Sequence, residues 1–73
     1  MEKNATQAKR ILDYLKARDW VSTWELMHQC RVLSVTRRIF ELRNAGMTEG
    51  FLILLRWTKR DGQRIAEYKW VGN

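Results

Sequence analysis

Hydrophobic residues recur at helical spacing in the first part of the chain. Four of them occupy positions i, i+3, i+4 and i+7, namely Ala8, Ile11, Leu12 and Leu15. Side chains at this spacing share one face of an α-helix, so the pattern predicts an amphipathic helix of about four turns. We expect this helix to end near Arg18 or Asp19.

A second, shorter helix follows an apolar interruption. Trp20 and Val21 lie between two helical patterns, and they form either a very short strand or a link that fills the core. The next four residues read S-T-W-E, which is the pattern of a capping box. In that motif the Ser22 hydroxyl accepts a hydrogen bond from the Glu25 amide, and the Glu25 carboxylate returns one. The pattern predicts a helix over about residues 23–30.

A narrow apolar stripe indicates a third helix. Three residues form it at positions i, i+4 and i+7, namely Val35, Ile39 and Leu42. Ser34 precedes them as a candidate N-cap. We expect the helix to run to about Ala45 and to end at Gly46, because glycine is the residue most often found at a left-handed C-cap.

The last third of the chain predicts a β-hairpin. Residues 51–58 and 64–71 flank the dipeptide Asp61-Gly62, a strong turn signal because both positions tolerate positive φ. Pairing outward from this turn places mostly apolar pairs on one face: Trp57 with Ala66, Leu55 with Tyr68, and Ile53 with Trp70. On the other face Arg56 lies opposite Glu67. A slip of one residue would spoil both results, so the register is specified.

These elements predict the fold class. A two-stranded hairpin is not stable alone in water, so its apolar face must pack on the helices. We expect all four tryptophans to lie in the core, because a small domain needs large side chains: Trp20, Trp24, Trp57 and Trp70. The class is α+β, three helices followed by a C-terminal hairpin. We expect a single domain over residues 1–73, with an ordered core of about residues 5–71.

Basic residues dominate the charge. The chain has 14 lysines and arginines against eight acidic residues, for a net charge of +6. Residues 34–44 and 58–64 together hold six basic residues but only two acidic ones, Glu41 and Asp61. A positive field on two segments favours a polyanionic partner, and nucleic acid is the commonest one.

The sequence lacks the residue sets that catalysis, metal binding or membrane insertion require. The single cysteine, Cys30, cannot form an internal disulfide, and His28 points to a different side of its helix, so no metal site is expected. No nucleophile–base pair or phosphate-binding glycine loop occurs, so we expect no enzyme activity, cofactor or small-molecule substrate. The longest apolar run, residues 51–55, is too short to cross a membrane. We expect a cytoplasmic protein, since no signal-peptide pattern is present.

Five features of the chain together carry a resemblance. They are residues 22–26, the link 31–33, residues 34–43, Gly46, and the hairpin with K-R-D-G at its tip. Their order and spacing resemble the winged helix-turn-helix family over about residues 5–71. The segment T-R-R-I-F-E-L-R-N-A-G is especially similar to small helix-turn-helix proteins of bacteriophages and prophages. The resemblance implies a winged helix-turn-helix that binds double-stranded DNA, as a transcriptional regulator or an architectural protein.

The resemblance also implies which residues meet DNA. In such folds the third helix enters the major groove, so the helix face opposite the apolar stripe should make contact. Arg37 is the first choice for base reading, because a bidentate guanidinium–guanine pair contributes about 1–3 kcal/mol of discrimination. The hairpin tip is expected to touch the backbone or the minor groove. The full set is Ser34, Thr36, Arg37, Arg38, Glu41, Arg43 and Asn44 from the helix, and Lys59, Arg60, Gln63 and Arg64 from the tip.

Three residues of the helix face have alternative roles. Glu41 is expected either to pair with Arg37 or Arg38, or to accept a hydrogen bond from a cytosine amine. Asn44 is expected to read adenine or to reach a phosphate. Phe40 is expected to pack beneath the hairpin or against the segment around Met47, with contact to a thymine methyl as the alternative.

Three apolar residues fall on the hairpin face that points away from the predicted core: Leu52, Leu54 and Val71. They indicate a dimer or partner interface, unless the N-terminal arm or the first helix covers them. A homodimer, or cooperative binding on DNA, is expected because one helix-turn-helix contacts few base pairs. Two other functions stay open. One is a module that binds a host or phage protein, and the other is binding of structured RNA.

Overall fold

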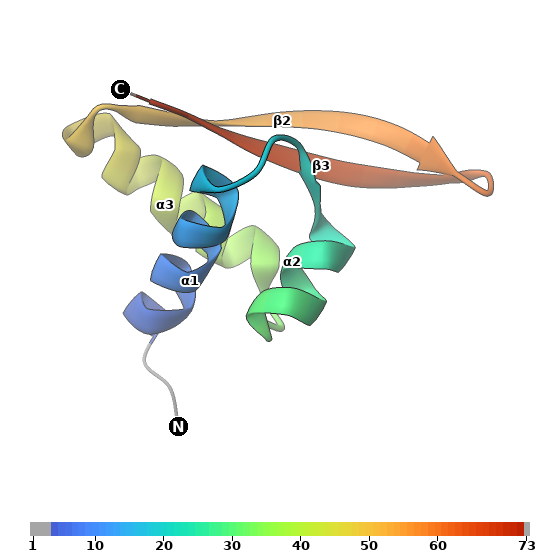
Figure 1. The fold of residues 1–73 in the computed structure, drawn as a ribbon, viewed down its shortest axis with the longest axis horizontal. Helices are drawn as coiled ribbons and strands as arrows, with labels where there is room; N and C mark the ends of the chain where they lie inside the picture. Colours follow the sequence, from blue (N-terminus) through green and yellow to red (C-terminus); the bar gives the residue numbers. More distant parts are fainter. Residues whose placement is uncertain (1–3, 73) are drawn as a thin grey trace.

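The computed structural model describes the backbone of residues 4–72 and the side chains of residues 6–72. Its helices are α1 (Asn4–Lys16), α2 (Thr23–Cys30) and α3 (Val35–Glu49). Its strands are β1 (Val21–Ser22), β2 (Phe51–Arg60) and β3 (Gln63–Gly72). They form one antiparallel sheet in the order β1-β3-β2, and the hairpin crosses the helices (Figure 1). The predicted α+β class is confirmed, and residues 1–3 and 73 lie outside the described part of the chain.

The start of α2 shows how the first two helices are joined. Val21 belongs to β1 and pairs with Tyr68, so the short-strand alternative holds. The Ser22 hydroxyl accepts a hydrogen bond from the Glu25 amide at 3.0 Å, as predicted for the capping box. The Glu25 carboxylate instead accepts a hydrogen bond from the Tyr14 hydroxyl at 2.6 Å. The predicted local return bond is thus replaced by a contact between α1 and α2.

The third helix is longer than predicted, and Gly46 does not end it. The helix continues to Glu49, and Gly50 is the left-handed C-cap with φ 85°. Gly46 is buried inside the helix, where a Cβ would lie 2.5 Å from the carbonyl oxygen of Phe51. Its role is therefore close packing between α3 and the start of β2. The sequence offers two glycines four residues apart, and the later one terminates the helix.

The hairpin register agrees with the prediction at every pair named. Ile53 lies opposite Trp70, Leu55 opposite Tyr68, Trp57 opposite Ala66, and Arg56 opposite Glu67. Asp61 and Gly62 form the turn with φ values of 51° and 79°, the left-handed pair that suits a two-residue hairpin loop. Both strands extend further toward the turn than predicted, to Arg60 and from Gln63.

The core lies where the three helices meet one end of the hairpin. Five side chains are essentially inaccessible to solvent: Ile11, Leu15, Val21, Leu26 and Val32. Phe51, Ile53 and Tyr68 add the contribution of the hairpin. We call residues 51–54 and 68–72 the hairpin base, and residues 55–67 the wing. The wing continues past the helices and ends in the free turn (Figure 1).

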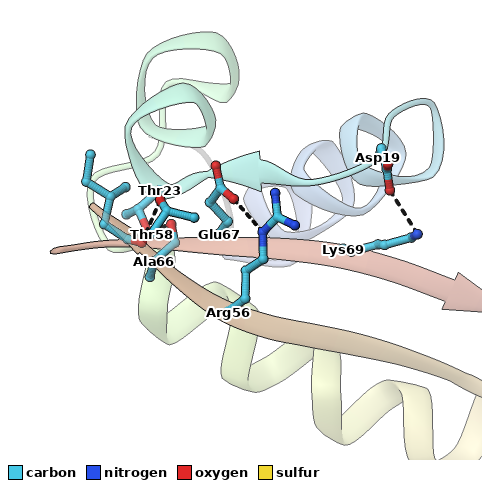
Figure 2. A network of polar contacts seen from close by, with 8 residues as sticks. Asp19, Thr23, Arg56, Thr58, Ala66, Glu67 and Lys69 are labelled. Atoms are coloured by element: carbon cyan, nitrogen blue, oxygen red, sulfur yellow. Dashed lines mark hydrogen bonds and ion pairs between the residues drawn. The ribbon is translucent and has the colours of Figure 1, made fainter. Parts of the chain in front are cut away.

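Polar contacts fix the sheet to the elements around it, as Figure 2 shows. The Thr23 hydroxyl donates to the Ala66 carbonyl at 3.1 Å, which ties the start of α2 to β3. Three further contacts act across the sheet or at its edge: Arg56 Nε–Glu67 Oε1 at 2.7 Å, Lys69 Nζ–Asp19 Oδ1 at 2.9 Å, and the Thr58 hydroxyl to the Ile65 carbonyl at 3.4 Å. Of these contacts, the Thr23–Ala66 bond is the one that joins the wing to α2, and the others link the two hairpin strands or the hairpin base to Asp19.

Candidate nucleic-acid interface

The link between α2 and α3 forms a tight turn. Arg31 adopts the left-handed conformation, with φ 55°, and its amide donates to the Met27 carbonyl. Val32 is completely buried and anchors the turn in the core. This geometry sets α3 at an angle to α2 and turns one of its faces outward.

Five of the seven predicted α3 residues lie exposed on that outer face: Ser34, Thr36, Arg37, Arg43 and Asn44. Ser34 stands at the N-cap position, but its hydroxyl makes no capping bond. The hydroxyl and the first amides of the helix therefore remain available for an anion. Arg43 is held in place, because its Nε donates to the Ile53 carbonyl at 3.2 Å.

Arg38 does not belong to this face. Its exposed fraction is 3%, and its Nη2 lies 3.3 Å from a carboxylate oxygen of Glu41. The Glu41–Arg38 pairing is therefore confirmed, and it occupies a carboxylate that was also proposed to accept from cytosine. Arg38 was predicted among the DNA-facing residues, but it is buried, because the buried arc of α3 is wider than the apolar stripe indicates.

The wing tip brings together four predicted residues. Lys59, Arg60, Gln63 and Arg64 are all exposed around the Asp61-Gly62 turn. Lys59 lies opposite Arg64, on the side of the hairpin that faces the helices. The Arg64 guanidinium stands over the Trp57 ring, 4.7 Å from its centroid.

The exposed cations in the described part of the chain fall into two groups: some are paired with a carboxylate, and others, which include Lys9, Lys16 and Arg31 besides those of α3 and the wing tip, are not. Arg18, Arg56 and Lys69 each lie within 4.0 Å of a carboxylate. Among the described residues, no carboxylate approaches the exposed cations of α3 and the wing tip: Arg37, Arg43, Lys59, Arg60 and Arg64. Their positive charge is therefore not neutralised locally.

A cleft of about 480 Å³ separates the N-terminal part of α3 from the wing. We call it the wing cleft. Its lining includes three large aromatic side chains that are more than half exposed: Trp24 at 63%, Phe40 at 65% and Trp57 at 56%. The expectation that Trp24 and Trp57 lie in the core is wrong, and Phe40 lies open beside the cleft. Trp57 is exposed because the wing extends beyond the helices, whereas Trp24 lies on the surface of α2, where it stacks on His28.

The outer face of the hairpin base carries the predicted apolar patch. Leu52 and Val71 lie directly opposite each other, and Leu54 follows on the same face. Their exposed fractions are 62%, 40% and 40% for Leu52, Leu54 and Val71, so neither α1 nor any other described segment covers them. Met47 of α3, 84% exposed, lies beside Leu52 and Val71 around a shallow hollow. We call these four residues the outer patch.

The remaining candidates for chemistry have structural roles. His28 stacks on Trp24, with ring centroids 5.0 Å apart. Cys30 is buried, as expected, and burial raises the pKa of its thiol, which disfavours the reactive thiolate. Within residues 6–72 no group of three histidine, cysteine, aspartate or glutamate side chains is placed to hold a metal ion. No helix in the described part of the chain has the length and apolar character needed to cross a membrane.

A helix-turn-helix followed by a β-hairpin, with a short strand completing a three-stranded sheet, defines a winged helix-turn-helix domain. The family model described as "Winged helix-turn-helix domain" matches residues 6–70. The chain therefore belongs to this family, whose members are typically non-enzymatic DNA-binding domains. Searches of curated proteins and of solved structures gave no significant match.

Sequence reasoning missed the functional potential of two kinds of residue. Arg31 is exposed at the turn between α2 and α3, beside the face predicted to meet DNA. Trp24, Phe40 and Trp57 form an exposed aromatic group, although the two tryptophans were assigned to the core and packing was the first expectation for Phe40. The hairpin register could have indicated that Trp57 is exposed. It places Trp57 two positions from Lys59, close to the free turn, where the helices do not reach.

Proposed function

We propose that this protein is a double-stranded DNA-binding transcriptional regulator or architectural protein of the bacteriophage or prophage type, acting in the cytoplasm. In this proposal α3 enters the major groove, and the wing tip lies on the backbone or in the minor groove. The main support for this proposal is a set of five exposed cations on α3 and the wing that have no carboxylate partner among the described residues. Unneutralised cations on two adjoining elements suit a polyanion.

The roles within this interface follow from position. Arg37 lies exposed in the first turns of α3, where a guanidinium can reach guanine O6 and N7. Ser34 and Thr36 stand at the start of the helix and suit phosphate oxygens. Lys59 and Arg60 at the wing tip supply backbone contacts that carry no sequence information.

Salt dependence of binding tests the proposal. A labelled DNA duplex is titrated at several salt concentrations, with an RNA duplex of the same sequence as competitor. Each phosphate contact contributes roughly 0.9 to the slope of log affinity against log salt. The double variant Arg37→Ala/Arg60→Ala should lower both affinity and slope. The matched control Arg18→Ala/Arg56→Ala removes the same charge from carboxylate-paired positions and should change neither.

We further propose that two copies pair through the outer patch. Three of its four side chains lie on the hairpin base and Met47 lies near the C-terminal end of α3, so the patch is at the far end of the hairpin from the wing tip and away from the start of α3. Leu52→Asp should abolish a dimer seen by sedimentation velocity. Leu33→Asp changes a residue that is 90% exposed outside the patch, and it should leave the dimer intact.

A second candidate function is binding of a protein partner. Leu33 at 90% exposure and Phe40 at 65% border an apolar hollow with Met27 between α2 and α3. Absence of DNA binding at low salt would favour this candidate. Loss of partner binding in Leu33→Asp, with no effect from Arg60→Ala, would identify the surface.

A further inference from the structure

The wing cleft exposes three large aromatic side chains that do not contribute to the core. Trp24 and Phe40 come from α2 and α3, and Trp57 comes from the opposing face of the wing. Each keeps more than half of its surface accessible to solvent. Aromatic side chains gathered around a hollow are typical of the lining of ligand sites.

The charged residues that line the cleft favour a negatively charged ligand. Two arginines, Arg43 and Arg64, line it, and no aspartate or glutamate does. Arg64 stands over one face of the Trp57 ring and His28 stacks on one face of the Trp24 ring, so each indole has one face left for a flat ligand. The Thr36 hydroxyl adds a hydrogen-bonding group, while the Thr23 hydroxyl already donates to the Ala66 carbonyl. A ligand that combines flat rings with negative charge fits this set, and a nucleotide has both.

Paired bases cannot use such a site. In a duplex the faces of the bases are stacked on one another, and only their edges are accessible in the grooves. An unpaired base exposes its faces, and stacking on aromatic side chains is how proteins bind it. A wedge that inserts between base pairs would have to protrude, whereas these side chains line a hollow of about 480 Å³, within the usual range of ligand sites.

We propose that the wing cleft binds an unpaired base of DNA, stacked against Trp57 and Trp24, with its flanking phosphates on Arg43 and Arg64. This inference rests on the proposed function, in that the partner is DNA. It adds that the preferred DNA carries an unpaired base beside the duplex that α3 contacts.

Three DNA ligands of one sequence test the inference. The first is a perfect duplex, the second has a single-base bulge, and the third has an abasic bulge with the same backbone but no base. Affinities are measured by fluorescence anisotropy of a labelled strand. We expect the base bulge to bind about tenfold more tightly than the abasic bulge, because stacking of one base has this magnitude.

Variants locate the effect. Trp57→Ala and Trp24→Ala should remove the preference for the base bulge, and both side chains are exposed enough for the fold to persist, which circular dichroism checks. Leu52→Ala, an exposed apolar residue on the other face of the hairpin, should keep the preference. Arg60→Ala should weaken binding to all three ligands alike.

The outcomes separate the two proposals. Equal affinity for the base bulge and the abasic bulge overturns the unpaired-base site while leaving duplex binding intact. Preference for the base bulge that survives both tryptophan substitutions also overturns it. No binding to any of the three ligands overturns the DNA-binding function and this inference together.

Discussion

Ile53 and Leu55 stand two residues apart on the same face of β2, yet Ile53 is 5% exposed and Leu55 is 41% exposed. The alternation of apolar residues is continuous along this face, from the hairpin base into the wing. The helices end part of the way along it, so one half of the face completes the core and the other half faces the wing cleft. The same pattern therefore serves stability in one region, and we propose that it serves recognition in the other.

The largest expected effect is a difference in the stability lost when an apolar residue is shortened in the hairpin base and in the wing. Ile53→Ala should lower the free energy of unfolding by about 2–5 kcal/mol, because it leaves a cavity among buried side chains. Leu55→Ala should cost less than about 1 kcal/mol, since much of the side chain is already in water. Urea denaturation measures both, and Ile53→Val, at about 0.5–1.5 kcal/mol, keeps the comparison accessible if the alanine variant unfolds. Equal losses at the two positions would contradict the contrast.

The second effect tests the close packing of α3 against the start of β2, which fixes the hairpin base to the helices. Gly46→Ala should cost about 1–3 kcal/mol, because the added methyl group would meet the Phe51 carbonyl oxygen at 2.5 Å and the β2 backbone must shift. Thr48→Ala, at an exposed position of the same helix, is the control and should be neutral or slightly stabilising. Thermal unfolding compares them. A neutral Gly46→Ala would show that α3 and β2 are not in close contact.

A smaller effect is expected where the wing begins. Arg56 and Glu67 pair across the strands at 2.7 Å, and the Arg56 guanidinium also lies 4.3 Å from the centroid of the Trp20 ring. A double-mutant cycle with alanine at both positions should give a coupling of about 0.2–1 kcal/mol, because the pair is partly exposed. The coupling should shrink at high salt. A coupling of zero at low salt would show that the pair does not stabilise the wing.

The smallest expected effect is a pH dependence of stability that arises from the contact between α1 and α2, away from the wing. The hydrogen bond to Glu25, with desolvation and the Glu25 charge, raises the pKa of Tyr14 above its ordinary value of 10.0. The folded state thus holds this proton more tightly than the unfolded state. The resulting stabilisation is complete below about pH 10 and is lost as the pH rises through the folded-state pKa. The stability difference between the parent and Tyr14→Phe should therefore shrink from about pH 8 to about pH 11.

Urea denaturation at several pH values measures this difference. A difference that stays constant over the range would show that the Tyr14–Glu25 bond does not couple protonation to folding. Glu25→Gln is the companion variant, because it removes the charge at Glu25 but keeps an oxygen that can accept the hydrogen bond, and it should weaken the same pH dependence.

The hairpin was the most predictable part of the fold. Its register follows from the sequence because only one alignment places Ile53 with Trp70 on an apolar face and Arg56 opposite Glu67. The capping box was half predictable, since Ser22 depends on local spacing, whereas the Glu25 carboxylate is bound by Tyr14 from a different helix. Sequence patterns therefore predicted the features that depend on contacts between residues close together in the chain.

The errors arise where tertiary contacts decide. Gly46 has the sequence position of a helix end, but its lack of a side chain serves contact with Phe51. Arg38 flanks the apolar stripe, and the stripe alone does not show how wide the buried arc is. Trp57 alternates with the core residues, but the reach of the helices beneath the wing has no signal in the strand pattern. The outer face of α3 was predictable because it needs only helical periodicity.

One residue, Gly50, separates the end of α3 from the start of β2. With Gly46 packed against Phe51, this junction joins the helix to the hairpin through a single residue and in close contact. On the proposed interface, the spacing between the bases that α3 reads and the phosphates that the wing tip touches is then set by the number of residues in the wing. Two residues more in each strand would shift the tip by about 7 Å, or roughly two base pairs along the duplex. Wing length in such proteins would thus determine how long a stretch of DNA one domain covers.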